Sequence, residues 1–207
     1  MAVIDGARDE RADLLDLLRS LAPEQWQHPT LCSGWDVRDV VAHVLGYDDL
    51  SGRQLLQRFA GGRWDTDRIN AAVLADFDGA SPQQLLDRLA SHLRPRGLTA
   101  GMGGRIGLTD ALVHHQDIRR PLGLPRQVPL DRVLVALPTA LFAPVVQGIR
   151  RVWDVRLVAT DAQWSFGRGP QVRGPAEALL MTVAGRSAAL EELEGPGVPR
   201  IAPRLPG

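Results

Sequence analysis

The segment DALVHHQDIRR, residues 110–120, combines a helical pattern with several side chains that can bind a metal ion. Helical periodicity runs from about residue 105 to residue 119. Asp110 and His114 are four residues apart, so a helix places them on one face, about 6 Å apart along its axis. Both side chains can then reach one ion. The other interpretation is a polar helix end, because the helix dipole favours histidine near the C-terminus.

A third ligand must come from another helix, and His43 is the best candidate. A helix is expected to begin after Asp36, an N-cap residue with Asp39 at the third helical position. His43 lies in this helix next to the apolar stripe, and a buried neutral imidazole needs a partner. A metal ion is one such partner, and a backbone carbonyl or the Asp39 carboxylate is another. Two histidines and one carboxylate would leave a coordination position open, as in catalytic zinc sites.

Helical patterns dominate the first 150 residues and predict a mainly α fold. Long helices joined by breaker-rich loops are typical of an antiparallel four-helix bundle. The expected helices cover residues 7–21, 37–59, 65–77, 81–93, 105–119 and a proline-kinked, apolar 130–150.

The pattern changes near residue 152. Residues 152–160, VWDVRLVAT, alternate apolar and polar side chains as a half-buried strand does, and a second strand candidate and a helix follow. The tail, residues 195–207, is rich in proline and glycine and is expected to be extended. We therefore predict a helical bundle at residues 1–151, followed at 152–207 by a small α/β domain with an extended tail.

Composition narrows the class of protein. The chain has 207 residues with 24 basic and 24 acidic side chains, and this balance argues against a nucleic-acid partner. Every basic residue is arginine, a bias associated with GC-rich bacterial genomes. The longest uncharged run, residues 133–149, is short for a membrane span and contains two prolines. With a single cysteine and no apolar signal core, the expected location is the cytoplasm, without membrane attachment.

Three segments resemble one family over nearly the whole chain. They are TLCSGWDVRDVVAHVLGYDD at 30–49, DALVHHQDIRRPLG at 110–123 and DVRLVATDAQWSFGRGPQVRGPAEALLMTVAGR at 154–186. The first two resemble the signatures of the DinB-like, mycothiol-dependent maleylpyruvate isomerase family, and the third resembles its small C-terminal domain. The resemblance implies a DinB-like four-helix bundle that holds a divalent metal, usually zinc, on two histidines and a carboxylate.

Carried over to this sequence, the metal ligands fall on His43, Asp110 and His114, the three residues that spacing had already singled out. One departure is that the characterised isomerase has glutamate where this chain has Asp110. Aspartate is one methylene shorter. The helix must therefore come closer, a water must intervene, or the affinity for metal falls.

Further polar residues near this motif are candidates to support the metal or to bind substrate. Asp117 shares a flank with His114 and either orients it or pairs with an arginine of the last turn. His115 points about 100° away, so a polar surface role is expected for it, with a contact to a neighbouring helix as the alternative. Arg119 and Arg120 suit the negative end of the helix, and an anion clamp is their functional alternative.

Two residues beside the first signature are expected to be structural. Trp35 is expected to anchor the core at the helix start. Cys32 is expected to be a small apolar filler, and it becomes a nucleophile only if a nearby cation lowers the pKa of its thiol. Asp39, beyond its capping role, is kept as a second-shell candidate.

The resulting hypothesis is a metal-dependent enzyme that uses a low-molecular-weight thiol, mycothiol in the family, on a small electrophilic substrate. A metal-bound thiolate would add to the substrate. Release of the thiol gives cis–trans isomerisation, and retention gives thiol transfer. The alternatives are a non-enzymatic bundle that binds a small ligand or partner, and a metal-dependent hydrolase. The pattern specifies neither a monomer nor a homodimer.

Overall fold

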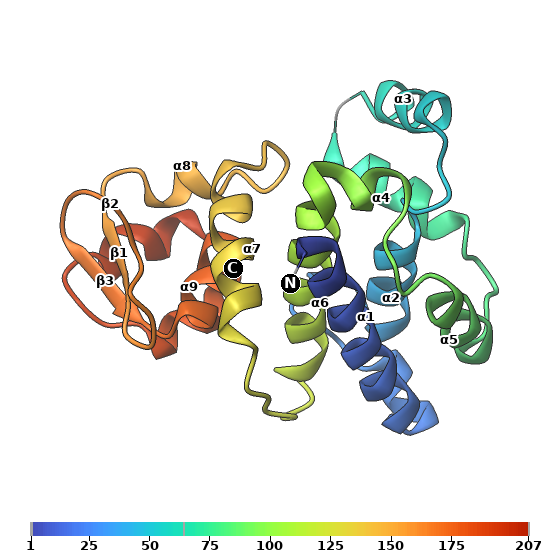
Figure 1. Cartoon of the computed structure of the whole chain (residues 1–207), viewed down its shortest axis with the longest axis horizontal. Coiled ribbons are helices and arrows are strands. Elements are labelled where there is room, and N and C mark those ends of the chain that lie inside the picture. The colour runs from blue at the N-terminus through green and yellow to red at the C-terminus, as the bar shows by residue number, and fades with distance from the viewer. Residues whose placement is uncertain (1, 64, 207) are drawn as a thin grey trace. The chain divides into compact units, whose positions relative to one another are not determined.

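The computed structural model describes residues 2–63 and 65–206, and it divides the chain into two compact units, Met1–Arg126 and Gln127–Gly207. The fold is mainly α with one small sheet, which confirms the predicted class (Figure 1). Within the described residues, no helix is both long enough and apolar enough to cross a membrane.

The first unit is built around a four-helix bundle. Helices α1 and α2 each pack against both α5 and α6, so the four close a ring around one core (Figure 1). The helices of this unit are α1 (Val3–Ser20), α2 (Val37–Leu45), α3 (Gly52–Gly61), α4 (Thr66–Ala75), α5 (Pro82–Ser91) and α6 (Arg105–Arg119). Core residues include Leu14, Leu18, Val40, Val41, Val44, Leu45, Leu85, Leu89 and Ile118.

Helix α2 begins where its sequence predicts. The Asp36 carboxylate accepts a hydrogen bond from the backbone N–H of Asp39 at 2.9 Å, and the Asp39 carboxylate accepts one from the Asp36 N–H at 3.3 Å. This reciprocal cap satisfies N–H groups that the helix leaves unpaired. It fixes the first turn of the helix that carries His43.

The predicted continuous helix over residues 37–59 is wrong, because the chain breaks after Leu45. Gly46 packs so closely on α4 that a Cβ atom there would lie 2.1 Å from Val73 Cγ1. A new helix, α3, then starts at Gly52, and the hydroxyl of the preceding Ser51 caps it. The close contact between Gly46 and α4 lies at this break, and helical periodicity does not report such a contact.

The second unit contains helices and the small sheet. Its elements are α7 (Leu130–Phe142), α8 (Gly148–Val152), β1 (Arg156–Ala159), β2 (Ser165–Gly167), β3 (Gln171–Gly174), α9 (Ala176–Val183) and α10 (Val198–Ile201). The strand order is β2-β1-β3, with β1 antiparallel to β2 and parallel to β3. The predicted strands at β1 and β2 are confirmed, whereas β3 was not expected.

Three expectations for the second half differ from the structure. The kinked helix over 130–150 is two helices, because Ala143, just before Pro144, takes an extended conformation that ends α7. The tail is not wholly extended, since α10 and a short 3-10 turn at Ala202–Arg204 lie within it. The predicted domain boundary at residue 151 also differs from the observed division after Arg126, because α7 packs on α8 and α9.

A fully buried ion pair ties the bundle together at one end. Arg11 of α1 pairs with Asp48, which follows α2, and neither side chain is exposed. Arg11 also donates to the backbone carbonyls of Val44 and His92, and Thr99 donates its hydroxyl to Asp48. The pair thus joins α1 to the chain after α2, after α5 and before α6. Because both side chains are buried, removing either one leaves an uncompensated charge in the core.

We expect Arg11→Met to lower the free energy of unfolding by roughly 3–5 kcal/mol, because it strands the Asp48 carboxylate in the core. Urea unfolding followed by circular dichroism measures this loss. Arg19→Met is the matched control, since its pair with Asp16 is solvent-exposed and should contribute little. Equal stability of the two variants would contradict the role given to Arg11.

Candidate functional site

The structure brings His43, Asp110 and His114 together. His43 Nε2 and His114 Nε2 each lie 3.5 Å from Asp110 Oδ1, and the two imidazole ring centres are 4.8 Å apart. One ligand atom of each residue lies within 4.8 Å of the others. Asp110 and His114 share a face of α6, and His43 reaches them from α2, as the sequence predicted.

The spacing of these atoms fits a small divalent cation. A tetrahedral ion with bonds of about 2.0–2.1 Å separates its ligand atoms by roughly 3.3 Å. Both nitrogen-to-oxygen distances are close to this value. The shorter side chain of Asp110 therefore reaches both imidazoles directly, because α2 and α6 pack closely enough.

Aromatic side chains enclose the His43 ring. The Trp35 ring lies 5.1 Å from His43 and 6.5 Å from His114, and Tyr47 meets His43 edge-on at 5.5 Å. The Tyr47 hydroxyl donates to Asn70 Oδ1 of α4 at 3.0 Å. Trp35, which was expected only to anchor the core, therefore also contacts both histidine rings. Tyr47, four residues after His43, was not singled out in the sequence, although that spacing could have suggested it.

The local charges favour an ionised Asp110 and a neutral tyrosine. Burial alone would raise the pKa of the Asp110 carboxyl, but a hydrogen bond with His43 and the charges of His114 and Arg11 hold it below its ordinary value. Burial, together with the negative charge of Asp110, raises the pKa of Tyr47 to about 12. The carboxylate is therefore available as an anionic ligand at neutral pH.

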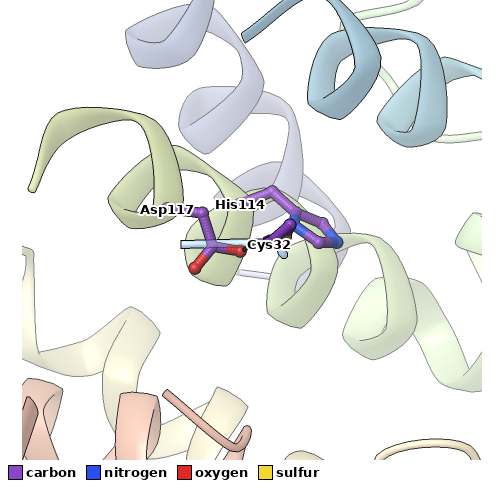
Figure 2. Close-up of side chains that lie close together, drawn as sticks. All are labelled: Cys32, His114 and Asp117. Carbon is purple, nitrogen blue, oxygen red and sulfur yellow. Dashed lines mark hydrogen bonds and ion pairs between the residues drawn. The ribbon is translucent and has the colours of Figure 1, made fainter. Parts of the chain in front are cut away.

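The far side of the His114 ring meets a second group of polar atoms. His114 Nδ1 lies 2.9 Å from Asp117 Oδ2, and the Cys32 thiol donates to that same oxygen at 3.1 Å. Figure 2 shows the three side chains converging. Burial opposes charge on His114, but its electrostatic interaction with Cys32 and its hydrogen bonds to Asp117 and Cys32 outweigh burial and raise the pKa of His114 to about 10.

This arrangement favours the interpretation of Asp117 as an orienting residue. A carboxylate that accepts from Nδ1 leaves Nε2 to face Asp110 and His43. The Asp117 side chain is fully buried, which fixes its direction. Cys32 was expected to be an apolar filler; the structure instead places its sulfur 3.7 Å from His114 Nδ1. A loop contact made across 82 residues leaves no periodic signal in the sequence.

The remaining candidates lie away from these ligands. His115 is fully buried, and its Nδ1 lies 2.9 Å from Glu10 Oε1 of α1, so the expected surface role is wrong. The amphipathic pattern misled here, because α6 is packed on both faces within the bundle. Arg119 donates to His115 Nε2 at 2.9 Å, and Arg126 pairs with both Glu10 oxygens.

Two more candidates occupy helix ends. Arg120 is the C-cap residue of α6, where its backbone N–H donates to the Gln116 carbonyl. Asp39 caps the N-terminus of α2, and burial raises its pKa despite its hydrogen bond with Asp36. Both positions suit the structural interpretation of these side chains.

The fold and the paired histidines with their carboxylate define a bundle protein with a candidate metal centre between α2 and α6. Residues 7–97 match the family model described as the mycothiol maleylpyruvate isomerase N-terminal domain. This match covers the helical part of the chain from α1 to the segment after α5, and it identifies that part as similar to the N-terminal domain of mycothiol-dependent maleylpyruvate isomerases. The matched domain agrees with the family resemblance found in the sequence.

Solved structures support the same fold. The chain is similar to the crystal structure of the mycothiol-dependent maleylpyruvate isomerase, with a TM-score of 0.62 and 13% sequence identity. The match covers 94% of this chain and 91% of that one. A histidine-to-alanine mutant of that isomerase matches equally well. No curated protein sequence matches the chain significantly.

The raised pKa of His114 makes the stability of the metal-free protein depend on pH. Its folded-state pKa of about 10 exceeds the ordinary 6.5, so its contribution is complete below about pH 6.5 and is lost as pH rises toward 10. We expect the free energy of unfolding to fall in this window by up to about 1.4 kcal/mol per pH unit.

Urea unfolding of metal-free protein between pH 6 and 10 measures this slope. His114→Gln should flatten the curve, whereas His28→Gln, in the loop before α2, should follow the wild type. Superimposable curves for wild type and His114→Gln would show that the His114 charge is not coupled to folding.

Proposed function

We propose that the chain is an enzyme that binds one divalent cation, with zinc expected, and uses a low-molecular-weight thiol on a small electrophilic substrate. The observation that carries the proposal is the convergence of His43, Asp110 and His114, with both imidazole Nε2 atoms 3.5 Å from one carboxylate oxygen. The match to the mycothiol maleylpyruvate isomerase N-terminal domain suggests the thiol, for which mycothiol is the candidate. A cytoplasmic location, where such thiols stay reduced, accords with the proposal.

The donor set suits a catalytic rather than a closed structural ion. Two nitrogens and one oxygen from the protein leave room for a further ligand. When bound, such an ion acts as a Lewis acid that lowers the pKa of a thiol and favours the nucleophilic thiolate. The reaction class is then cis–trans isomerisation if the thiol is released, or thiol transfer if it is retained.

The surrounding residues hold and shield this chemistry. Asp117 accepts the Nδ1 hydrogen of His114 and so presents Nε2 toward Asp110. Trp35 and Tyr47 flank the His43 ring and limit its rotation, while Asn70 holds the Tyr47 hydroxyl. The His43 and His114 side chains are only 12% and 11% exposed, and this burial strengthens electrostatic interactions there.

Metal analysis tests the binding site directly. Protein purified without chelator should contain about one equivalent of a divalent ion, because three ligands converge on one point. His114→Ala should remove this ion, since it leaves one imidazole and one carboxylate. His28→Ala is the control and should keep it. A wild type that carries no ion and binds none on titration would overturn the metal proposal.

Turnover assays test the thiol. Incubation with mycothiol and a panel of α,β-unsaturated electrophiles should give turnover that disappears without thiol or with His43→Ala. Turnover that persists without thiol would favour a hydrolase, in which metal-bound hydroxide attacks instead. Absence of turnover with every thiol in the panel would favour a non-enzymatic bundle.

A further inference from the structure

Behind the proposed metal site, three different ligand atoms form a second triangle. Cys32 Sγ lies 3.7 Å from His114 Nδ1 and 3.1 Å from Asp117 Oδ2, and that oxygen lies 2.9 Å from Nδ1. All three are within 4.8 Å of one another. Figure 2 shows the thiol meeting the imidazole and the carboxylate, which both project from α6.

The chemistry of these atoms matches a thiophilic cation. Around a tetrahedral zinc ion, with bonds of about 2.3 Å to sulfur and 2.0 Å to nitrogen or oxygen, ligand atoms are roughly 3.3–3.5 Å apart. The observed triangle needs adjustments of only a few tenths of an ångström. A thiolate with an imidazole selects zinc, cadmium or copper(I) over magnesium or calcium, which prefer oxygen ligands.

The backbone holds the thiol in place at this position. The N–H of Leu31 donates to the Asp117 carbonyl at 3.1 Å, which pins the loop to α6. The N–H of Cys32 donates to Thr30 Oγ1 at 3.2 Å. The Asp117 side chain is fully buried, and that of His114 is 11% exposed. The three ligand atoms are therefore arranged by the fold rather than by a chance surface encounter.

We propose that Cys32, His114 Nδ1 and Asp117 form a second metal site, selective for thiophilic cations, that shares the His114 imidazole with the first. A neutral imidazole offers one nitrogen lone pair and carries a hydrogen on the other nitrogen. His114 can therefore serve one site at a time. A cation at the second site takes a ligand from His43 and Asp110. This competition rests on the proposed function, but the second site itself does not.

Cadmium titration of purified, metal-free protein tests the second site. Cadmium bound to a thiolate has an ultraviolet charge-transfer band, and cadmium held only by nitrogen and oxygen does not. Wild type and His43→Ala should both develop this band, and Cys32→Ser should lack it. If Cys32→Ser does not fold, as judged by circular dichroism, Cys32→Ala replaces it. Absence of the band in wild type would overturn the proposal.

Asp117→Asn separates a built site from a cysteine that binds cadmium alone. The apparent Kd from the band should rise about 10- to 100-fold in this variant, because it loses an anionic ligand. Asp87→Asn, on the exposed face of α5, is the control and should leave the Kd unchanged. An unchanged Kd in Asp117→Asn would mean that the thiol acts without its neighbours, which contradicts the proposal.

Competition is measured on zinc-loaded protein with a colorimetric chelator. Cadmium should release zinc from the wild type as the band grows, and should release none from Cys32→Ser at the same concentration. A band that grows without zinc release would overturn the competition between sites. If the wild type binds no zinc, the proposed function fails, whereas the cadmium band still decides the second site.

Discussion

The site depends on the close packing of α2 against α6. Asp110 and His114 share a face of α6 through helical spacing, but His43 reaches them only because the apolar stripe of α2, with Val40, Val41 and Val44 fully buried, brings the two backbones together. Burial of this stripe supplies the free energy that holds three polar side chains in one place. The short side chain of Asp110 is sufficient because of this proximity.

A large part of the fold could be predicted from local patterns. Helix α6 has the expected bounds, and the cap at Asp36 follows from residue types at fixed offsets. The errors share one cause, which is contact between distant segments. α2 ends at Gly46, where α4 lies in close contact, and α7 joins the second unit because it packs on α9. A periodic pattern describes one face of one helix and does not identify its partner.

In the candidate site, too, local patterns could be predicted and contacts between distant segments could not. Its three proposed ligands could be found from i,i+4 spacing, one histidine beside an apolar stripe, and a family resemblance. His115 was misjudged because α6 is buried on two faces, so the side chain turned away from the site meets Glu10 of α1. Cys32 was misjudged because its contacts come from a loop whose path no local pattern specifies. Tyr47 was not predicted as part of the site. It lies after the end of α2 and contacts the His43 ring from there.

His114 is the residue at which these features meet. Its Nε2 faces Asp110, and its Nδ1 faces Asp117 and Cys32. A charge near one ring nitrogen therefore changes the basicity of the other. A carboxylate behind a metal-ligating imidazole makes it a better ligand. The Cys32 thiol donates its hydrogen to the same Asp117 oxygen that His114 contacts. This second hydrogen bond weakens the effect of the carboxylate on the imidazole. Cys32 therefore influences the proposed metal centre through Asp117, even when it binds no ion itself.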